Sequence, residues 1–250
     1  MFRWIKEDFS CIIESGEKMK ATIDFFNTKT TEEIAQYLLG MYLEHKTASG
    51  NLGGYIVDAE AYLGPADEAA HSFGLKMTPR LQAMYEKPGT IYLYTMHTHL
   101  ILNMVTKEKG IPQGVMIRAI EPVTGLAQME ANRNGRSGAE LTNGPGKLVA
   151  ALGITKNLYG QSIFDSSLRL VPEKRKYPKK ILDLPRIGIP NKGIWTEMPL
   201  RYVVSGNPYL TKQRSAAIDH ADFGWKDGTN EKNNDVDLLG SSINETFSGL

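Results

Sequence analysis

The sequence lacks the features that mark membrane-spanning and disulfide-stapled proteins. Its 250 residues include one cysteine, Cys11, so no internal disulfide can form. No apolar run approaches the ~18 residues that a transmembrane helix requires. Residues 1–18 have neither the continuous apolar core nor the small-residue cleavage site of a signal peptide. These absences predict an intracellular protein.

Metal-binding patterns are equally scarce. His97 and His99 would point to the same side of a strand, because strand side chains alternate with a period of two. No third ligand lies near them in the sequence, and no His-Glu-x-x-His or Cys-x-x-Cys pattern is present. We therefore expect no metal ion and no cofactor.

Charge is distributed unevenly along the chain, although the net charge is only +1. Residues 211–250 hold four basic and seven acidic side chains and few large apolar ones, which predicts a flexible acidic tail. Residues 1–24 form a short leader, and the remaining residues, 25–210, carry a net charge of +5. Such a surplus suits a phosphate-binding surface, but an ordinary solvated surface explains it equally well.

Hydrophobic patterning predicts a single α+β domain across residues 25–210. A capping box, Thr30-x-x-Glu33, precedes apolar residues at helical spacing, and Gly40 is placed to end this helix. Short turns join most of the strand-like segments, which favours a curved, largely antiparallel sheet surrounded by helices. The expected strands are 41–45, 54–62, a pair within 90–106, 115–119 and 201–204, and the later helices lie near 124–132 and 145–153.

The strand at 54–62 carries the most informative pattern. Alternation places Asp58, Glu60 and Tyr62 on one face and mainly apolar residues on the other. A carboxylate held among apolar and aromatic groups has a raised pKa, which suits a general base. The alternative is a solvated strand face with ordinary acids, and periodicity alone favours that alternative.

A strand expected at 91–97 carries aromatic rings at alternate positions. Tyr92, Tyr94 and Met96 share one face. Rings spaced in this way serve either cross-strand packing in the core or the stacking of nucleic-acid bases. Spacing alone favours core packing.

Two basic features allow both a structural and a functional interpretation. The helix start at 143–147 exposes backbone N–H groups beside Lys147, and such a junction can bind an anion. The run at 169–180 has six basic residues and one acidic residue, which is typical of a solvated loop and compatible with phosphate contacts. Neither signal is specific.

Longer motifs carry a family resemblance. The stretch from Asp58 to Ser72, DAEAYLGPADEAAHS, resembles the signature of the alkyladenine (3-methyladenine or methylpurine) DNA glycosylase family. Further matches occur in the same order as in that family, and together they cover residues 25–210. They are Thr78–Arg80, Lys87–Tyr94, Arg118–Pro122, Asn143–Leu148 and Pro199–Val203.

The resemblance implies an enzyme that binds duplex DNA through the minor groove and extrudes a damaged purine. It implies hydrolysis of the N-glycosidic bond without a metal ion, a covalent intermediate or strand-cleaving lyase activity. By this resemblance Glu60 is the general base that activates a water molecule. Arg118 and the backbone around Val204 would lie at that water.

The same resemblance assigns residues to the base and to the DNA. Tyr62 and Tyr94 would stack on the extruded base, and His71 would contact its edge. Asn103 would line the same pocket. Arg80 and Lys147 are expected to contact the DNA.

The chain departs from the family at a DNA-inserting hairpin. The family usually has a Tyr-Gly pair three residues past the second stacking tyrosine, and this tyrosine wedges into the gap left by the extruded base. Here His97 and Thr98 occupy these positions, and the segment up to Asn103 is one residue shorter. We predict that Met96 or His97 replaces the wedge, since apolar side chains commonly enter the minor groove. Asp58 replaces a more usual glutamate, which we expect to matter little.

These observations predict a base-excision-repair glycosylase for alkylated or deaminated purines. We expect a monomer that acts on double-stranded DNA and, in a bacterium, is cytoplasmic and nucleoid-associated. Family-like sequence begins near Met19, which predicts that Met19 is the natural start and that residues 1–18 are an extension.

Two alternatives stay open. A changed wedge would allow a protein that binds and extrudes lesions with little excision. A carbohydrate hydrolase would use Asp58 and Glu60 as its paired acids, but residues two apart lie only about 6.5–7 Å along one strand. Paired acids must flank a sugar from opposite sides, which neighbours on one strand face do not readily do.

Overall fold

A computed structural model of the chain describes residues 26–227. The expected leader, the proposed start at Met19 and the tail beyond residue 227 lie outside the described residues. One compact unit spans Thr30–Lys226 and contains all the elements discussed below. No helix within residues 26–227 is long and apolar enough to cross a membrane.

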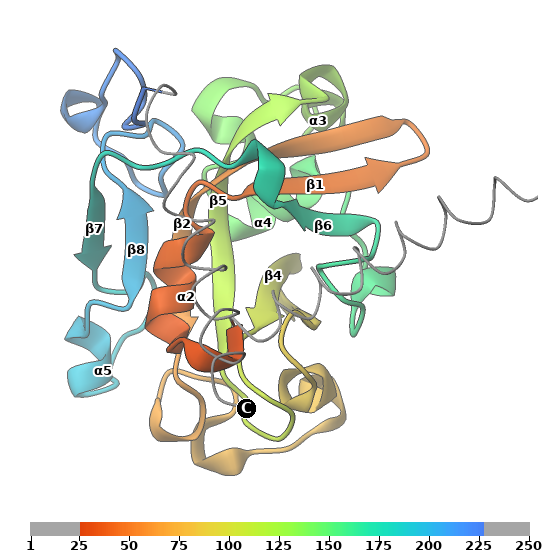
Figure 1. Ribbon diagram of the computed structural model, residues 1–250, viewed down its shortest axis with the longest axis vertical. Helices are drawn as coiled ribbons and strands as arrows, with labels where there is room; N and C mark the ends of the chain where they lie inside the picture. Colours follow the sequence, from red (N-terminus) through yellow and green to blue (C-terminus); the bar gives the residue numbers. More distant parts are fainter. Residues whose placement is uncertain (1–25, 228–250) are drawn as a thin grey trace, which may run out of the picture. The chain divides into compact units, whose positions relative to one another are not determined.

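The frame of this unit is a curved, antiparallel sheet (Figure 1), which confirms the expected α+β class. Within the described residues the sheet has eight strands. Six of them follow the order β3-β4-β5-β2-β1-β6, and β8, which also pairs with β7, joins at β2. The strands are β1 (Tyr42–Thr47), β2 (Gly50–Tyr62), β3 (Ile91–Met96), β4 (His99–Val105), β5 (Gly114–Thr124), β6 (Leu168–Val171), β7 (Ile181–Leu184) and β8 (Arg201–Val204).

Short helices surround the sheet. The α-helices are α2 (Thr31–Leu38), α3 (Leu126–Asn132), α4 (Pro145–Ala151) and α5 (Ile194–Glu197). Single turns of 3₁₀ helix occupy Gly64–Ala66, Phe73–Leu75, Gly138–Leu141, Lys156–Leu158, Pro172–Lys174 and Ser215–Ala217, and a longer one, η3, spans Pro79–Tyr85. Helix α2 lies against β2 and β5, and α4 lies against β4 and β5 (Figure 1).

The capping box predicted at the first helix is present. Thr30 Oγ1 accepts a hydrogen bond from the Glu33 N–H at 3.1 Å, and Glu33 Oε2 accepts one from the Thr30 N–H at 2.7 Å. The helix ends at Leu38, and Gly40 follows in the left-handed region with φ +85°. A Cβ at Gly40 would lie 1.9 Å from the Lys176 carbonyl oxygen, so this position requires glycine.

Strand β2 is central because both of its edges are paired. Along one edge its first half pairs with β1, and residues 58–60 pair with β8. Along the other edge it pairs with β5, with irregular register between Ile56 and Ala59. Asp58 and Glu60 are fully buried, and the interpretation of this strand face as solvated is wrong. Residues from distant segments cover the face, with Arg201 and Thr211 at Asp58 and Ile187 at Glu60, and periodicity cannot reveal such contacts.

Strands β3 and β4 form the expected hairpin, but its turn is tighter than predicted. Met96 pairs with His99, which leaves His97 and Thr98 as a two-residue turn with φ +45° and +72°. Positive φ at both central residues matches the right-handed strand twist that tight hairpins require. The expectation that His97 and His99 point to the same side as strand neighbours is thus wrong. Insertion of this hairpin into DNA stays a prediction.

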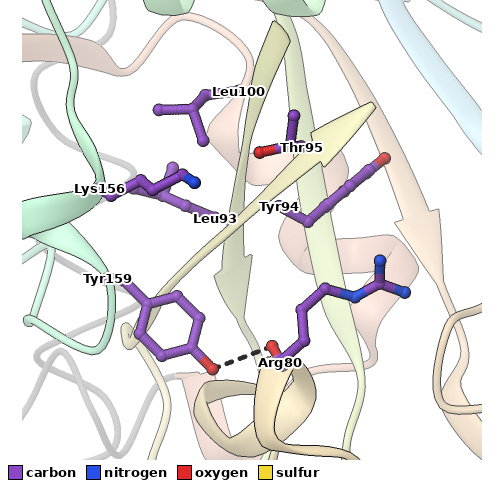
Figure 2. Close-up of a pocket in the computed structure, with 7 residues that line it drawn as sticks. All are labelled: Arg80, Leu93, Tyr94, Thr95, Leu100, Lys156 and Tyr159. Atoms are coloured by element: carbon purple, nitrogen blue, oxygen red, sulfur yellow. Dashed lines mark hydrogen bonds between the residues drawn. The ribbon is translucent and has the colours of Figure 1, made fainter. Parts of the chain in front are cut away.

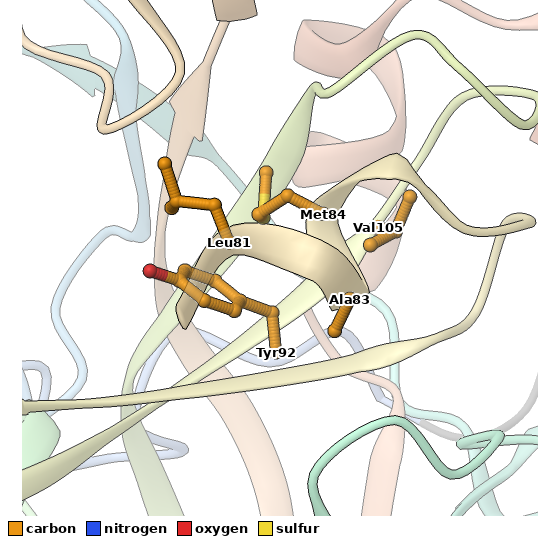
Figure 3. Packing of buried hydrophobic residues seen from close by; sticks show 5 residues of the cluster. All are labelled: Leu81, Ala83, Met84, Tyr92 and Val105. Carbon is orange, nitrogen blue, oxygen red and sulfur yellow. The ribbon is translucent and has the colours of Figure 1, made fainter. Parts of the chain in front are cut away.

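A small apolar cluster fixes η3 against β3 at the base of this hairpin. Tyr92 packs with Leu81, Ala83, Met84 and Val105 (Figure 3). The cluster fixes β3 and the part of η3 that contains Arg80 relative to each other, so both reach the same region of the surface.

The packed unit extends beyond residue 210, where the flexible tail was expected to begin. Trp225 is 4% exposed, and its Nε1 donates a hydrogen bond of 2.6 Å to Glu121 Oε2. Asn207 Nδ2 donates to the same carboxylate at 2.6 Å, and Lys176 pairs with its other oxygen at 3.1 Å. A buried acid in β5 thus anchors residues 211–226, which the polar composition of this segment concealed.

Candidate active site

Glu60 lies near the C-terminal end of β2, and both of its carboxylate oxygens are occupied. Oε1 accepts a hydrogen bond from the Ile187 N–H at 2.8 Å and lies 3.1 Å from Arg118 Nη1. Oε2 accepts a hydrogen bond from the Tyr62 hydroxyl at 2.9 Å. The carboxylate is therefore held by three donors from β2, β5 and the loop after β7.

Burial raises the pKa of Glu60 above its ordinary value of 4.5, and the charge of Asp58 adds to this effect. Arg118, the Ile187 N–H and the Tyr62 hydroxyl act in the opposite direction and stabilise the carboxylate. A base whose proton affinity is increased in this way, yet which remains hydrogen-bonded as an anion, is suited to accept a proton from water.

Asp58 is engaged differently from Glu60. Arg201 Nε and Nη2 donate to its two oxygens at 2.9 and 2.7 Å, and the Thr211 N–H donates at 3.2 Å. Both oxygens serve this bidentate pair, so Asp58 is not placed as the second acid of a carbohydrate hydrolase. Arg118 Nε lies 4.0 Å from Asp58 and has no hydrogen-bond partner among residues 26–227.

A cavity of about 270 Å³, here called the base pocket, opens beside these groups. Its wall includes Tyr62, Arg118 and Ile187, so all three residues that donate to Glu60 line it, whereas Glu60 itself is fully buried. The other lining residues come from the segment between β2 and η3, from the β3–β4 hairpin, from β5 and from the loop after β7. They include His71, Tyr92, Tyr94, Met96, His97, Asn103, Met116 and residues 187–189.

Aromatic rings form one side of the base pocket. The His71 and Tyr94 rings meet edge to face at 4.4 Å, and the Tyr92 and Tyr94 rings are stacked at 5.7 Å. His71 Nδ1 lies 3.0 Å from the Tyr92 hydroxyl. Partial burial, followed by the charges of Arg80 and Lys76, lowers the pKa of His71 and so favours the neutral imidazole. Burial raises the pKa of Tyr94 to about 12, so its ring carries a protonated hydroxyl.

Asn103 is fixed on the neighbouring strand. It pairs with Tyr92 across the β3–β4 ladder, and its Nδ2 donates to the Tyr92 carbonyl at 3.3 Å. Only 7% of Asn103 is exposed, and it faces the base pocket. The six residues expected around the base and its water (Glu60, Tyr62, His71, Tyr94, Asn103 and Arg118) are therefore brought together.

The residues expected to contact DNA divide into two groups. Met96, 44% exposed, and His97 stand at the hairpin tip and line the mouth of the base pocket. Arg80 is exposed, and its charge is close enough to lower the pKa of His71. Lys147 lies on α4, where its Nζ contacts Glu140 Oε2 at 2.7 Å and Asn143 Oδ1 at 2.8 Å. The charge of Lys147 is thus partly neutralised, which weakens the expected anion site.

Sequence reasoning missed two features of the site, the loop 187–189 and the buried ion pair that holds this loop. Val204 was expected beside the water, but its carbonyl accepts a hydrogen bond from the Asn207 N–H and the loop 187–189 lines the pocket instead. A buried pair, Asp67 with Arg186, holds this loop. Asp67 lies inside the family-like motif, whereas nothing in the pattern around Arg186 indicated its role.

The basic run at 169–180 is mostly paired with acids. Arg169 and Lys174 both contact Glu44, at 2.8 and 3.1 Å, and Lys176 contacts Glu121. These cations stabilise the fold, so the run is not a free phosphate-binding loop. Within the described part of the chain, no group of three or more His, Cys, Asp and Glu side chains is placed to hold a metal ion.

Comparisons with known proteins agree with this arrangement. A family model described as "Methylpurine-DNA glycosylase (MPG)" matches residues 24–208. A protein of Enterococcus faecalis is 78% identical over 223 residues, which is 89% of this chain and 97% of the relative. A Listeria monocytogenes protein is 51% identical over 79% of this chain and 95% of its own length, and one from Staphylococcus epidermidis is 49% identical over 82% and 98%. All three are named "Putative 3-methyladenine DNA glycosylase".

The fold and the site define the class of the protein as a DNA N-glycosylase, an enzyme that acts on DNA in base repair. The chain belongs to the methylpurine-DNA glycosylase family, as its motifs predicted.

Proposed function

We propose that this enzyme removes alkylated or deaminated purines, 3-methyladenine among them, from duplex DNA. It would act as a monomer, extrude the damaged nucleotide into the base pocket and hydrolyse the N-glycosidic bond with water activated by Glu60. The observation that carries this proposal is a buried carboxylate with a raised pKa behind an aromatic pocket sized for one flat base.

Extrusion is needed because the scissile bond is unreachable within the duplex, and it costs a few kcal/mol. Lesions that weaken pairing lower this cost. Tyr62 and Tyr94 line the base pocket and offer ring faces to the extruded base. A cationic alkylpurine gains roughly 0.5–2 kcal/mol over such a ring from the cation–π interaction.

The chemical step needs one proton acceptor and no protein nucleophile. Glu60 takes a proton from water, and the water oxygen forms a bond to the sugar C1′. The bond from C1′ to the purine nitrogen breaks, and its electron pair leaves with the base, which neutralises a cationic alkylpurine. Arg118, 3.1 Å from Glu60, keeps the carboxylate charged. Because no covalent intermediate forms, the proposal excludes lyase activity.

The His97–Thr98 turn presents the wedge. Met96 precedes this turn and is exposed although apolar, and His97 is exposed at the tip. Either side chain can fill the gap that the extruded base leaves, as apolar wedges do in other minor-groove complexes. His71, with Nδ1 beside the Tyr92 hydroxyl, keeps Nε2 for the edge of the base.

The test uses short duplexes that each carry one lesion. Wild-type protein and Glu60→Gln are incubated with each duplex, and released base and alkali-labile abasic sites are measured. We expect excision by wild type, loss of excision in Glu60→Gln and no trapping of a covalent complex by borohydride. Lesion-specific binding without excision by wild type would instead support a lesion-binding protein and refute the hydrolase.

A further inference from the structure

A second cavity, of about 380 Å³, is lined by Leu93 and Thr95 of β3 (Figure 2), which alternate along the strand with Tyr92 and Met96 of the base pocket. Leu93 and Leu100 form an apolar wall, and Arg80 and Lys156 bring two positive charges. Tyr94 lines both cavities, so they are neighbours. Nothing in the proposed chemistry uses this second cavity.

The cavity is rigidly built. Tyr159 lies at its edge, where its hydroxyl accepts a hydrogen bond from the Ala83 N–H and donates one to the Arg80 carbonyl, both at 3.0 Å (Figure 2). Thr95 and Leu100 are directly paired in the β3–β4 ladder. The two cationic side chains are therefore attached to a fixed frame, although their ends are exposed.

The charge of the cavity is uncompensated. No acidic residue lines it. Neither Arg80 nor Lys156 forms an ion pair within residues 26–227, whereas Arg169, Lys174 and Lys176 all pair with buried acids. Two unpaired cations beside an apolar wall suit a phosphate group attached to a hydrophobic sugar.

We propose that this cavity binds a phosphate group of the DNA strand that carries the extruded base. Arg80 and Lys156 contact the phosphate, and Leu93 and Leu100 face the adjoining deoxyribose. Because Tyr94 lines both cavities, the phosphate belongs to a nucleotide close to the extruded one, and binding there supports Tyr94. The inference rests on the proposed function only in taking DNA as the partner.

The experiment measures binding of a duplex with a tetrahydrofuran abasic-site analogue, which cannot be turned over. Fluorescence anisotropy gives Kd between about 50 and 200 mM salt for wild type, Lys156→Gln and Lys46→Gln. Lys46 is a matched control because it is exposed and lines neither cavity. Thermal melting checks that each exposed substitution leaves the fold intact.

Loss of one phosphate contact should reduce the slope of log Kd against log salt by about 0.9 and weaken binding about eightfold at ~0.1 M salt. We expect this for Lys156→Gln and no change for Lys46→Gln. An unchanged slope in Lys156→Gln overturns the proposal. A second arm titrates the protein with inorganic phosphate at constant ionic strength and follows the amide NMR signals of Thr95 and Leu100. Shifts there combined with an unchanged DNA slope would assign the cavity to free phosphate and overturn the assignment to DNA.

The proposed function is tested separately by excision. Excision by wild type with an unchanged slope in Lys156→Gln would remove the phosphate site and leave the glycosylase. A Lys156-dependent slope without excision would keep the phosphate site and remove the hydrolase.

Discussion

Asp67 and Arg186 form a buried pair that takes no part in the proposed chemistry. Among such residues of the site, we expect this pair to be the most sensitive to substitution. Arg186 Nη1 and Nη2 donate to the two Asp67 oxygens at 2.5 and 2.9 Å, and both side chains are fully buried. Arg186 also donates to the Ala61 carbonyl and lies 4.7 Å over the Tyr62 ring. The next residue, Ile187, donates its N–H to Glu60.

Asp67→Ala would leave the guanidinium charged, buried and without its carboxylate. Removal of one partner from a buried ion pair costs about 3–5 kcal/mol, because the remaining charge stays desolvated. Replacement of both partners by apolar residues of similar volume is often neutral or even stabilising. We therefore expect Asp67→Ala to be severely destabilised, and the double variant Asp67→Leu, Arg186→Met to regain only part of that loss, because the Leu63 and Ala69 N–H groups still lose their acceptor.

Urea unfolding gives the free energies, and excision of a single lesion gives the functional readout. Glu86→Ala is a matched control, because the Glu86–Lys109 pair is exposed and such pairs contribute only about 0–1 kcal/mol. The double variant should fold but excise slowly, since the loop that carries Ile187 loses its anchor. A loss below about 1 kcal/mol in Asp67→Ala would refute the buried-charge argument. Full excision by the double variant would refute the positioning role.

Glu60, Tyr94 and Gly40 provide three further tests. In the proposed mechanism Glu60 acts only as a carboxylate, and burial raises its pKa. The value of kcat/KM should therefore fall as the pH drops through a value above 4.5. A pH profile in which this fall occurs at or below pH 4.5 would contradict the proposal. Tyr94→Ala should weaken lesion binding in anisotropy by about 1–3 kcal/mol through lost stacking, while Tyr94→Phe, which keeps the ring, should not. Gly40→Ala should destabilise by about 1–3 kcal/mol in thermal melts through its clash with the Lys176 carbonyl. Gly110→Ala shares the positive φ but meets nothing within 4 Å, so equal losses would exclude the clash.

The sequence alone was sufficient to predict the elements whose bounds are set by neighbouring residues. The capping box at Thr30 and Glu33 sets the start of α2, and Pro145 sets the start of α4. The β3–β4 hairpin was expected because two apolar segments lie close in the chain. Its turn was misjudged, since His97 and Thr98 are unusual residues for positive φ and carry no Gly or Asn signal.

Pairing between strands that are distant in the chain could not be predicted from local signals in the sequence. Strands β6 and β7 have four residues each. Strand β6 pairs with β1 across more than a hundred residues of chain, whereas β7 pairs with the nearby β8. The loop at 187–189 also makes a long-range contact, because Ile187 donates its N–H to Glu60, 127 residues earlier in the chain. The family resemblance placed the backbone around Val204 there, and a contact made by a loop leaves no local pattern in the sequence. Trp225 was hidden for a similar reason: one aromatic residue in a polar segment gives no periodicity.

Asp58 and Glu60 show why the site itself needed more than a pattern. Both are acids on the same strand face, both are fully buried, and periodicity treats them alike. Their difference comes from partners distant in the chain. Arg201 donates to both oxygens of Asp58 in a bidentate pair. Glu60 receives three separate donors, from Tyr62, Arg118 and Ile187, and all three residues line the base pocket, so its charge is supported beside the cavity. The proposed choice of Glu60 over Asp58 as the base therefore depends on which strand and which loop close over β2, and only the family-like motif around Glu60 carried that information in the sequence.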